Sequence, residues 1–213
     1  MDAFAFLAVV WIGIMIPCWA GLLVLAFGAT KLGIPVKSLS LNMGPGLPLG
    51  RLFGIPVRLG VIPGGNLDMD EERAAETSTA RRIGLTTLIP IVHLAVGVAI
   101  LGWDRGWSHF TEGFAQLVNG SLHPRTVGVG LLRAFDQVRS QSVTAAMGVL
   151  AAKQAALALL PIGGTWVTQF LRQLFYSNKV RAIEFGIMLL ALIGLLISGT
   201  WGLLTYFYAF GWR

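Results

Sequence analysis

Residues 32–70 read LGIPVKSLSLNMGPGLPLGRLFGIPVRLGVIPGGNLDMD, and this stretch decides how the fold is interpreted. It contains two short runs in which apolar side chains alternate at a period of two, a pattern typical of β-strands. The alternating positions are Leu39, Leu41 and Met43 against Ser38, Ser40 and Asn42, and then Ile55, Val57, Leu59 and Val61 against Pro56, Arg58 and Gly60. The segment between the runs is rich in glycine and proline, which favour turns. We expect a β ribbon that lies at the membrane interface or is shielded by protein, because an open sheet edge is not stable in lipid.

The composition is that of an integral membrane protein. The chain has 213 residues, of which 55% are hydrophobic and 12% are charged, and its mean hydropathy is +0.72. Its net charge of +6 could suggest nucleic acid, but the basic residues mostly flank apolar segments, so no nucleic-acid partner is expected. The single cysteine, Cys18, excludes an intramolecular disulfide and a metal cluster built on thiols.

Four segments are apolar and long enough to span a bilayer core of about 30 Å. They are residues 3–28, 83–102, 143–163 and 184–208. Between them lie the ribbon at 32–70, a charged link at 71–82, a less hydrophobic connection at 104–141 and a basic connection at 165–182. Within 104–141, the apolar spacing of residues 127–140 predicts an amphipathic helix. The predicted fold is a single, mostly α-helical membrane domain, residues 1–213, with a short β ribbon after the first transmembrane helix.

The basic residues are unevenly distributed among the connections. Ten lie in the first and third connections, and five lie in the middle connection or at the C-terminus. Because cytoplasmic loops carry an excess of lysine and arginine, we expect the ribbon and residues 165–182 in the cytoplasm. Both termini are then extracytoplasmic, and the chain resides in the cell (inner) membrane.

Two polar residues interrupt the predicted spans, His93 in the second and Lys153 in the third. A lysine at the centre of a membrane helix costs roughly 2.5 to 3.5 kcal/mol, so both residues should face protein or a water-filled pocket. They could serve a proton or ion path, or contact an acidic residue of a partner helix. Alternatively, His93 is neutral and hydrogen-bonded, and the Lys153 ammonium reaches the interface along its apolar stem. In the last span, Ser198 and Gly202 have the small-xxx-small spacing that allows another helix to approach closely.

Several segments occur in an order that resembles the site-2 protease family of intramembrane zinc metalloproteases. They are an apolar first helix, then LGIPVKSLSLNMGPGL, then a strand ending in VIPGG that is followed by acidic residues. Residues 88–94, LIPIVHL, correspond to the family's Gly-Pro-x-x-Asn motif, and residues 158–162, ALLPI, to its Asn-x-x-Pro stretch. In this family, the first helix carries HExxH and a later helix supplies an aspartate as the third zinc ligand.

The same comparison implies that the catalytic chemistry is missing. The window for HExxH falls on Gly21-Leu22-Leu23-Val24-Leu25, and the position of the aspartate falls near Trp166. A catalytic zinc needs three protein ligands and a group that handles the proton. His109 and His123 lie in the middle connection and are not expected to meet His93. We therefore expect no enzyme activity, no catalytic or metal-binding residues and no cofactor.

The favoured hypothesis is a catalytically inactive, site-2-protease-like subunit of a larger membrane complex. Besides the lipid bilayer, its partners would be other membrane subunits, or a single-pass helix or extended segment that it binds without cleaving. The contact sites would be Ser38 to Met43, Ile55 to Val61 and the last helix with Ser198 and Gly202, since an open strand edge can accept another strand. Two alternatives are an active zinc protease with displaced ligands and a small transport or proton-path subunit using Lys153 and His93.

Overall fold

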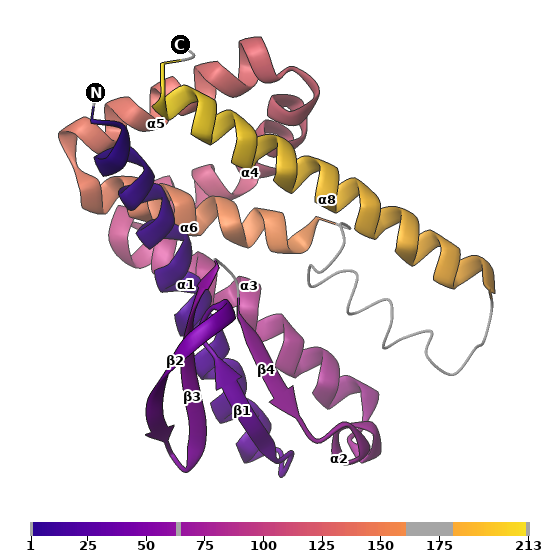
Figure 1. Cartoon of the computed structure of the whole chain (residues 1–213). Helices are drawn as coiled ribbons and strands as arrows, with labels where there is room; N and C mark the ends of the chain where they lie inside the picture. The colour runs from indigo at the N-terminus through magenta and orange to yellow at the C-terminus, as the bar shows by residue number, and fades with distance from the viewer. Residues whose placement is uncertain (1, 63–64, 161–180, 212–213) are drawn as a thin grey trace.

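The computed structural model describes residues 2–62, 65–160 and 181–211, which are mostly helical with one small sheet (Figure 1). Among these residues, three helices are long and apolar enough to cross a membrane. They are α1 (Ala3–Lys31), α3 (Thr79–Leu101) and the segment Met188–Ala209 of α8 (Arg181–Ala209). The chain is therefore an integral membrane protein, and the predicted fold class is confirmed.

The predicted third span, residues 143–163, corresponds to a shorter apolar helix, α6 (Val143–Leu159). It begins at Ser142, whose hydroxyl accepts a hydrogen bond from the backbone N–H of Ala145 at 3.1 Å. The end of this span lies outside the described residues, and so does nearly all of the predicted basic connection at 165–182. The side chain of Met43 is likewise outside the described part of the chain.

The ribbon after α1 is a four-stranded sheet with the order β2-β3-β1-β4. Its strands are β1 (Val36–Ser40), β2 (Met43–Leu52), β3 (Ile55–Ile62) and β4 (Asn66–Met69). The second predicted run corresponds to β3, whereas only Ser38–Ser40 of the first run lie in β1, since Leu41 and Asn42 follow that strand and Met43 begins β2. β1 and β3 pair in parallel with Leu39 opposite Val57. Leu39 and Val57 are both buried, so the predicted alternation places one face of the sheet against the helices.

The glycine- and proline-rich segment between these runs forms β2 rather than a series of turns. β2 pairs with β3 as an antiparallel hairpin at the edge of the sheet, where prolines such as Pro48 are tolerated. Position 46 has no room for a side chain, because a Cβ there would lie 2.6 Å from the carbonyl oxygen of Leu59, and it is therefore a glycine. The hairpin reverses at Phe53 and Gly54, which both have positive φ, as a type I′ turn requires.

The sheet folds back along the C-terminal half of α1 and beside α3 (Figure 1). The indole N–H of Trp19 in α1 donates a hydrogen bond to the Asn42 side chain at 3.0 Å. The Asn42 amide in turn donates to the carbonyl of Gly60 in β3, also at 3.0 Å. The sequence pattern groups Asn42 with exposed polar residues, but its side chain is only 1% exposed because it joins the sheet to α1.

Helix α4 (Trp103–Leu122) differs from the sequence expectation, which treats 104–141 as a connection. α3 ends at Gly102, where a φ of 82° lets the chain reverse, and α4 then packs against α3 and α6. The buried face of α4 consists of Gly106, Phe110, Gly113 and Gly120. Its low mean hydropathy reflects the exposed polar face, and glycines on the buried face allow neighbouring helices to come close.

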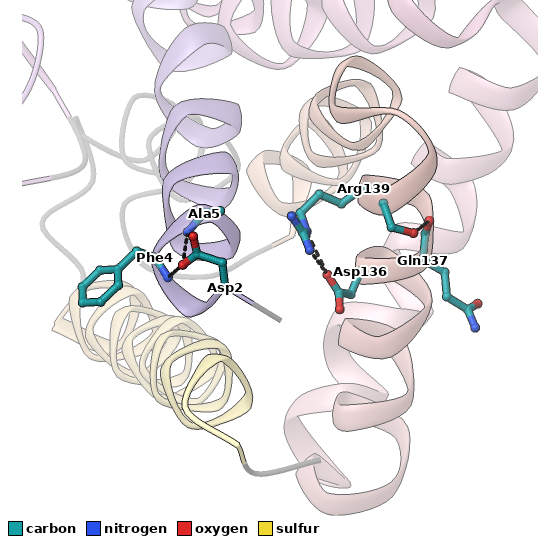
Figure 2. Close-up of polar contacts among 7 residues, drawn as sticks. Asp2, Phe4, Ala5, Asp136, Gln137 and Arg139 are labelled. Carbon is teal, nitrogen blue, oxygen red and sulfur yellow. Dashed lines mark hydrogen bonds and ion pairs between the residues drawn. The ribbon is translucent and has the colours of Figure 1, made fainter.

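The N-terminal end of α1 is held by α5 (Val129–Gln141) and the C-terminal end of α8. α5 follows a short π-helical turn, η1 (Pro124–Gly128), and nearly coincides with the predicted amphipathic helix. The Asp2 carboxylate accepts hydrogen bonds from the first backbone N–H groups of α1, as Figure 2 shows. In the same view, Arg139 of α5 forms an ion pair with Asp136, and the two side chains are 2.8 Å apart. The Arg139 guanidinium also lies over the ring of Phe6 in α1.

Candidate binding cavity

A cavity of about 1220 Å³ lies among the helices and is somewhat larger than the roughly 300–1,000 Å³ typical of ligand pockets. α1, α4, α5, α6 and α8 supply most of its lining, and α3 contributes Ile89 and His93. Most lining side chains are aliphatic or aromatic, including Trp11 of α1 and Trp201 of α8. The indole N–H of Trp201 donates to the backbone carbonyl of Leu117, 3.0 Å away, which ties α8 to α4 on one side of the cavity.

The polar groups of the cavity belong mainly to α3, α4 and α6. They are Cys18, His93, His109, Glu112, Gln116, Lys153 and Gln154, whereas Ser198 and Thr205 of α8 add hydroxyl groups. We call the first seven residues the polar wall. In an otherwise apolar cavity, a few convergent polar groups fix the orientation of whatever binds there.

Lys153 is linked to the polar residues of α4 by a chain of hydrogen bonds. Its ammonium donates to the Gln116 side-chain oxygen, and the Gln116 amide donates to Glu112 at 3.1 Å. Ser108 donates to the other carboxylate oxygen of Glu112 at 2.9 Å. Lys153 forms no ion pair with any residue in the described part of the chain, since Glu112 is reached only through Gln116.

The deeper part of the polar wall has unsatisfied groups. His93 is 5% exposed and lies against the backbone of Pro17 and Gln154, yet neither ring nitrogen has a hydrogen-bond partner among the described residues. The Gln154 amide nitrogen is also buried without a partner there. The Gln154 oxygen accepts a weak hydrogen bond from the Cys18 thiol at 4.0 Å. Buried polar groups without partners carry a free-energy cost that a suitable ligand could remove.

Four of the residues singled out from the sequence line the same cavity: His93, Lys153, Ser198 and Gly202. No described atom lies within 4 Å of a Cβ placed on Gly202, so no described helix of this chain makes the close approach predicted there. The residues singled out in the sheet lie elsewhere. Of these, Leu39, Asn42 and Val57 are buried, Val61 is exposed, and Ser38, Ser40, Leu41, Ile55 and Leu59 are partly buried.

His93 and His109 both line the cavity, yet no described group of three suitable side chains could hold a metal ion with them, so the prediction that they do not meet at a metal site stays a prediction. His109 reaches the cavity because the predicted connection contains α4, which packs against α3 and α6. Glu112, Gln116 and Gln154 were not singled out from sequence at all. The available signal was the spacing of His109, Glu112 and Gln116, which lie three and four residues apart on one side of a helix.

The window that corresponds to HExxH lies next to His93. A Cβ on Gly21 would lie 3.5 Å from His93 Nε2, so the start of this window contacts α3. The remaining window residues are Leu22, Leu23, Val24 and Leu25, which have no metal-binding atoms. Across the described residues, no group of three histidine, cysteine, aspartate or glutamate side chains is placed to hold a metal ion.

Comparison with known protein families, curated proteins and solved structures finds no match for this chain. The structure defines an integral membrane protein with a helical body, a small sheet and a cavity among its helices. The likeness to site-2 proteases stays a prediction from the order of sequence segments.

Proposed function

We propose that the chain is a non-catalytic, site-2-protease-like membrane protein that acts as a binding subunit of a larger membrane complex. The observation that carries the proposal is the meeting of α1, α3 and α6 around His93. Gly21 contacts His93, and both His93 and Ala158 of α6 line the cavity. In the resemblance, Gly21 begins the HExxH window and Ala158 takes the place of the motif's asparagine, and neither side chain can bind a metal. The position of the third ligand, near Trp166, lies outside the described residues.

The surfaces left for a partner are the N-terminal half of α8 and the edge of the sheet. α8 contacts other described helices near its C-terminal end, through Trp201, Leu204 and Tyr208. Figure 1 shows that its other end diverges from the helical body. That half presents Met188, Leu189, Leu192, Ile193, Leu195 and Leu196 on its exposed surface. A partner transmembrane helix could pack along this surface.

The outer edge of β2 is the second surface. Leu47 is 73% exposed, Leu49 is also exposed, and no described strand pairs with the outer edge of β2. An exposed edge of this kind can accept an extended segment by strand addition. With both termini extracytoplasmic, as the basic residues favour, this segment would come from the cytoplasmic side of the partner.

We expect site-specific photocrosslinking in native membranes to capture the same partner from both surfaces. The crosslinking residue would replace Leu195, which is 69% exposed on α8, or Leu47 on β2. The products are then identified after purification in mild detergent. A matched control replaces Ile91, which is exposed on α3 but belongs to neither surface.

One defined polypeptide crosslinked from Leu195 and Leu47, with none from Ile91, would support the subunit proposal. Equal, mixed products from all three positions would instead reflect random collisions in the bilayer. That outcome, or a clean single chain in mild detergent, would overturn the proposal.

A further inference from the structure

The polar wall contains a lysine, Lys153, that has no ion pair among the described residues. A lysine ammonium has three N–H donors, and within the described chain Lys153 uses one of them, on Gln116. The one carboxylate of the wall, Glu112, already accepts hydrogen bonds from Ser108 and Gln116. A group rich in acceptor oxygens would satisfy these donors, and a negative charge would complement Lys153.

The remainder of the cavity suits a hydrocarbon chain. α1, α5 and α8 line it mainly with apolar side chains, for example Ile14, Leu132 and Ile197. The volume of about 1220 Å³ is more than a headgroup alone would fill. The ligand chemistry that matches both parts is an acyl chain that ends in an oxyanion.

The position of the polar wall fits a lipid headgroup. α4 carries Asp104, Arg105, Ser108, Thr111 and Glu112 on its exposed side. A helix with one charged face and one apolar face is typical of the membrane interface, where headgroups lie. The hydrogen-bond chain from Glu112 to Lys153 leads from this exposed side into the cavity.

We propose that the cavity binds one anionic acyl lipid, with its carboxylate or phosphate oxygens on Lys153 and its acyl chain between α1, α5 and α8. This binding site does not depend on the subunit function proposed above. Lys153 would hold the headgroup by charge-assisted hydrogen bonds, while the apolar lining would accommodate the chain.

The test uses the full-length chain in phosphatidylcholine nanodiscs and cis-parinaric acid, a fluorescent fatty acid, as the probe. Trp11 and Trp201 line the cavity, so bound probe should accept energy from tryptophan and binding should saturate near one probe per chain. We expect Lys153→Gln to weaken binding roughly ten-fold or more, the effect of losing a charge-assisted hydrogen bond. Lys31→Gln, at the end of α1, is the matched charge control and should leave affinity unchanged.

A steric variant tests the cavity without touching its charge. Gly202 lines the cavity and has open space where a Cβ would lie, so Gly202→Leu should narrow the cavity beside the acyl chain and weaken binding without a clash. Gly199 lies on the same helix, also has open space and does not line the cavity, so Gly199→Leu should bind as wild type does. Equal binding by both glycine variants would overturn the assignment to this cavity.

The headgroup is tested by competition. Methyl parinarate, which lacks the charge, should bind more weakly than the acid and should be insensitive to Lys153→Gln; equal affinity of ester and acid would contradict an oxyanion site. Displacement by oleate indicates a fatty acid, and displacement by phosphatidylglycerol indicates a phospholipid. Displacement by inorganic phosphate alone, or by none of these, would overturn the proposal of an acyl lipid.

Discussion

Replacing Gly97 with leucine is expected to disrupt the packing of the helical body. Gly97 lies where α3 crosses α6, and a Cβ there would be 2.9 Å from the backbone nitrogen of Ala152. The obstructing atom belongs to a helix backbone, so a side chain can fit only if the two helices separate. Overpacking typically costs about 1–3 kcal/mol, and this position should reach or exceed the upper value.

The effect of Gly97→Leu can be measured as a fall in the thermal unfolding midpoint of the purified protein, roughly 6–12 °C. Gly84 on the same helix is the matched control, because no atom lies within 4 Å of its Cβ position. Gly84→Leu should leave the midpoint unchanged or raise it slightly, since leucine is the better helix former. Equal midpoints for the two variants would contradict the close packing of α3 on α6.

Replacing Asn42 with alanine should loosen the sheet from α1. The change leaves the Trp19 indole N–H and the Gly60 carbonyl without their hydrogen-bond partner. Each buried group left unsatisfied costs about 1–3 kcal/mol, so a loss of about 2–4 kcal/mol is expected. Hydrogen–deuterium exchange should show the amides of β1 and β3 exchanging faster, while those of α3 and α6 stay protected.

Ser40→Ala is the control for this second prediction. Ser40 lies two residues earlier, is partly buried, and has no side-chain hydrogen bond to a described residue. Its replacement should leave exchange in the sheet unchanged. If Asn42→Ala behaves in the same way, the Asn42 hydrogen bonds do not hold the sheet against α1.

The sequence predicted the features that depend on local pattern. Hydropathy located α1 and α3 because a long apolar segment is favoured in the bilayer core independently of the rest of the chain. The period-two alternation located β1 and β3 because Leu39 and Val57 are buried on one face of the sheet. Each of these signals is contained within a short window of the chain.

The features that sequence reasoning missed depend on contacts between distant segments. β2 is rich in glycine and proline, and it is a strand because it pairs with β3 at the sheet edge. α4 has low mean hydropathy, and its burial follows from glycines that fit against α3 and α6. The cavity joins Lys153 to Gln116, which are 37 positions apart in the chain. None of these contacts has a signature within a short window.

The central claim is that the site where α1, α3 and α6 meet binds without catalysing hydrolysis. The most direct measurement is the zinc content of the purified full-length protein after exposure to zinc and removal of free metal. The window Gly21 to Leu25 offers no metal-binding atoms, and no three suitable side chains come together in the described residues, so we predict far less than one zinc per chain. One zinc per chain that is lost in His93→Ala would contradict the account.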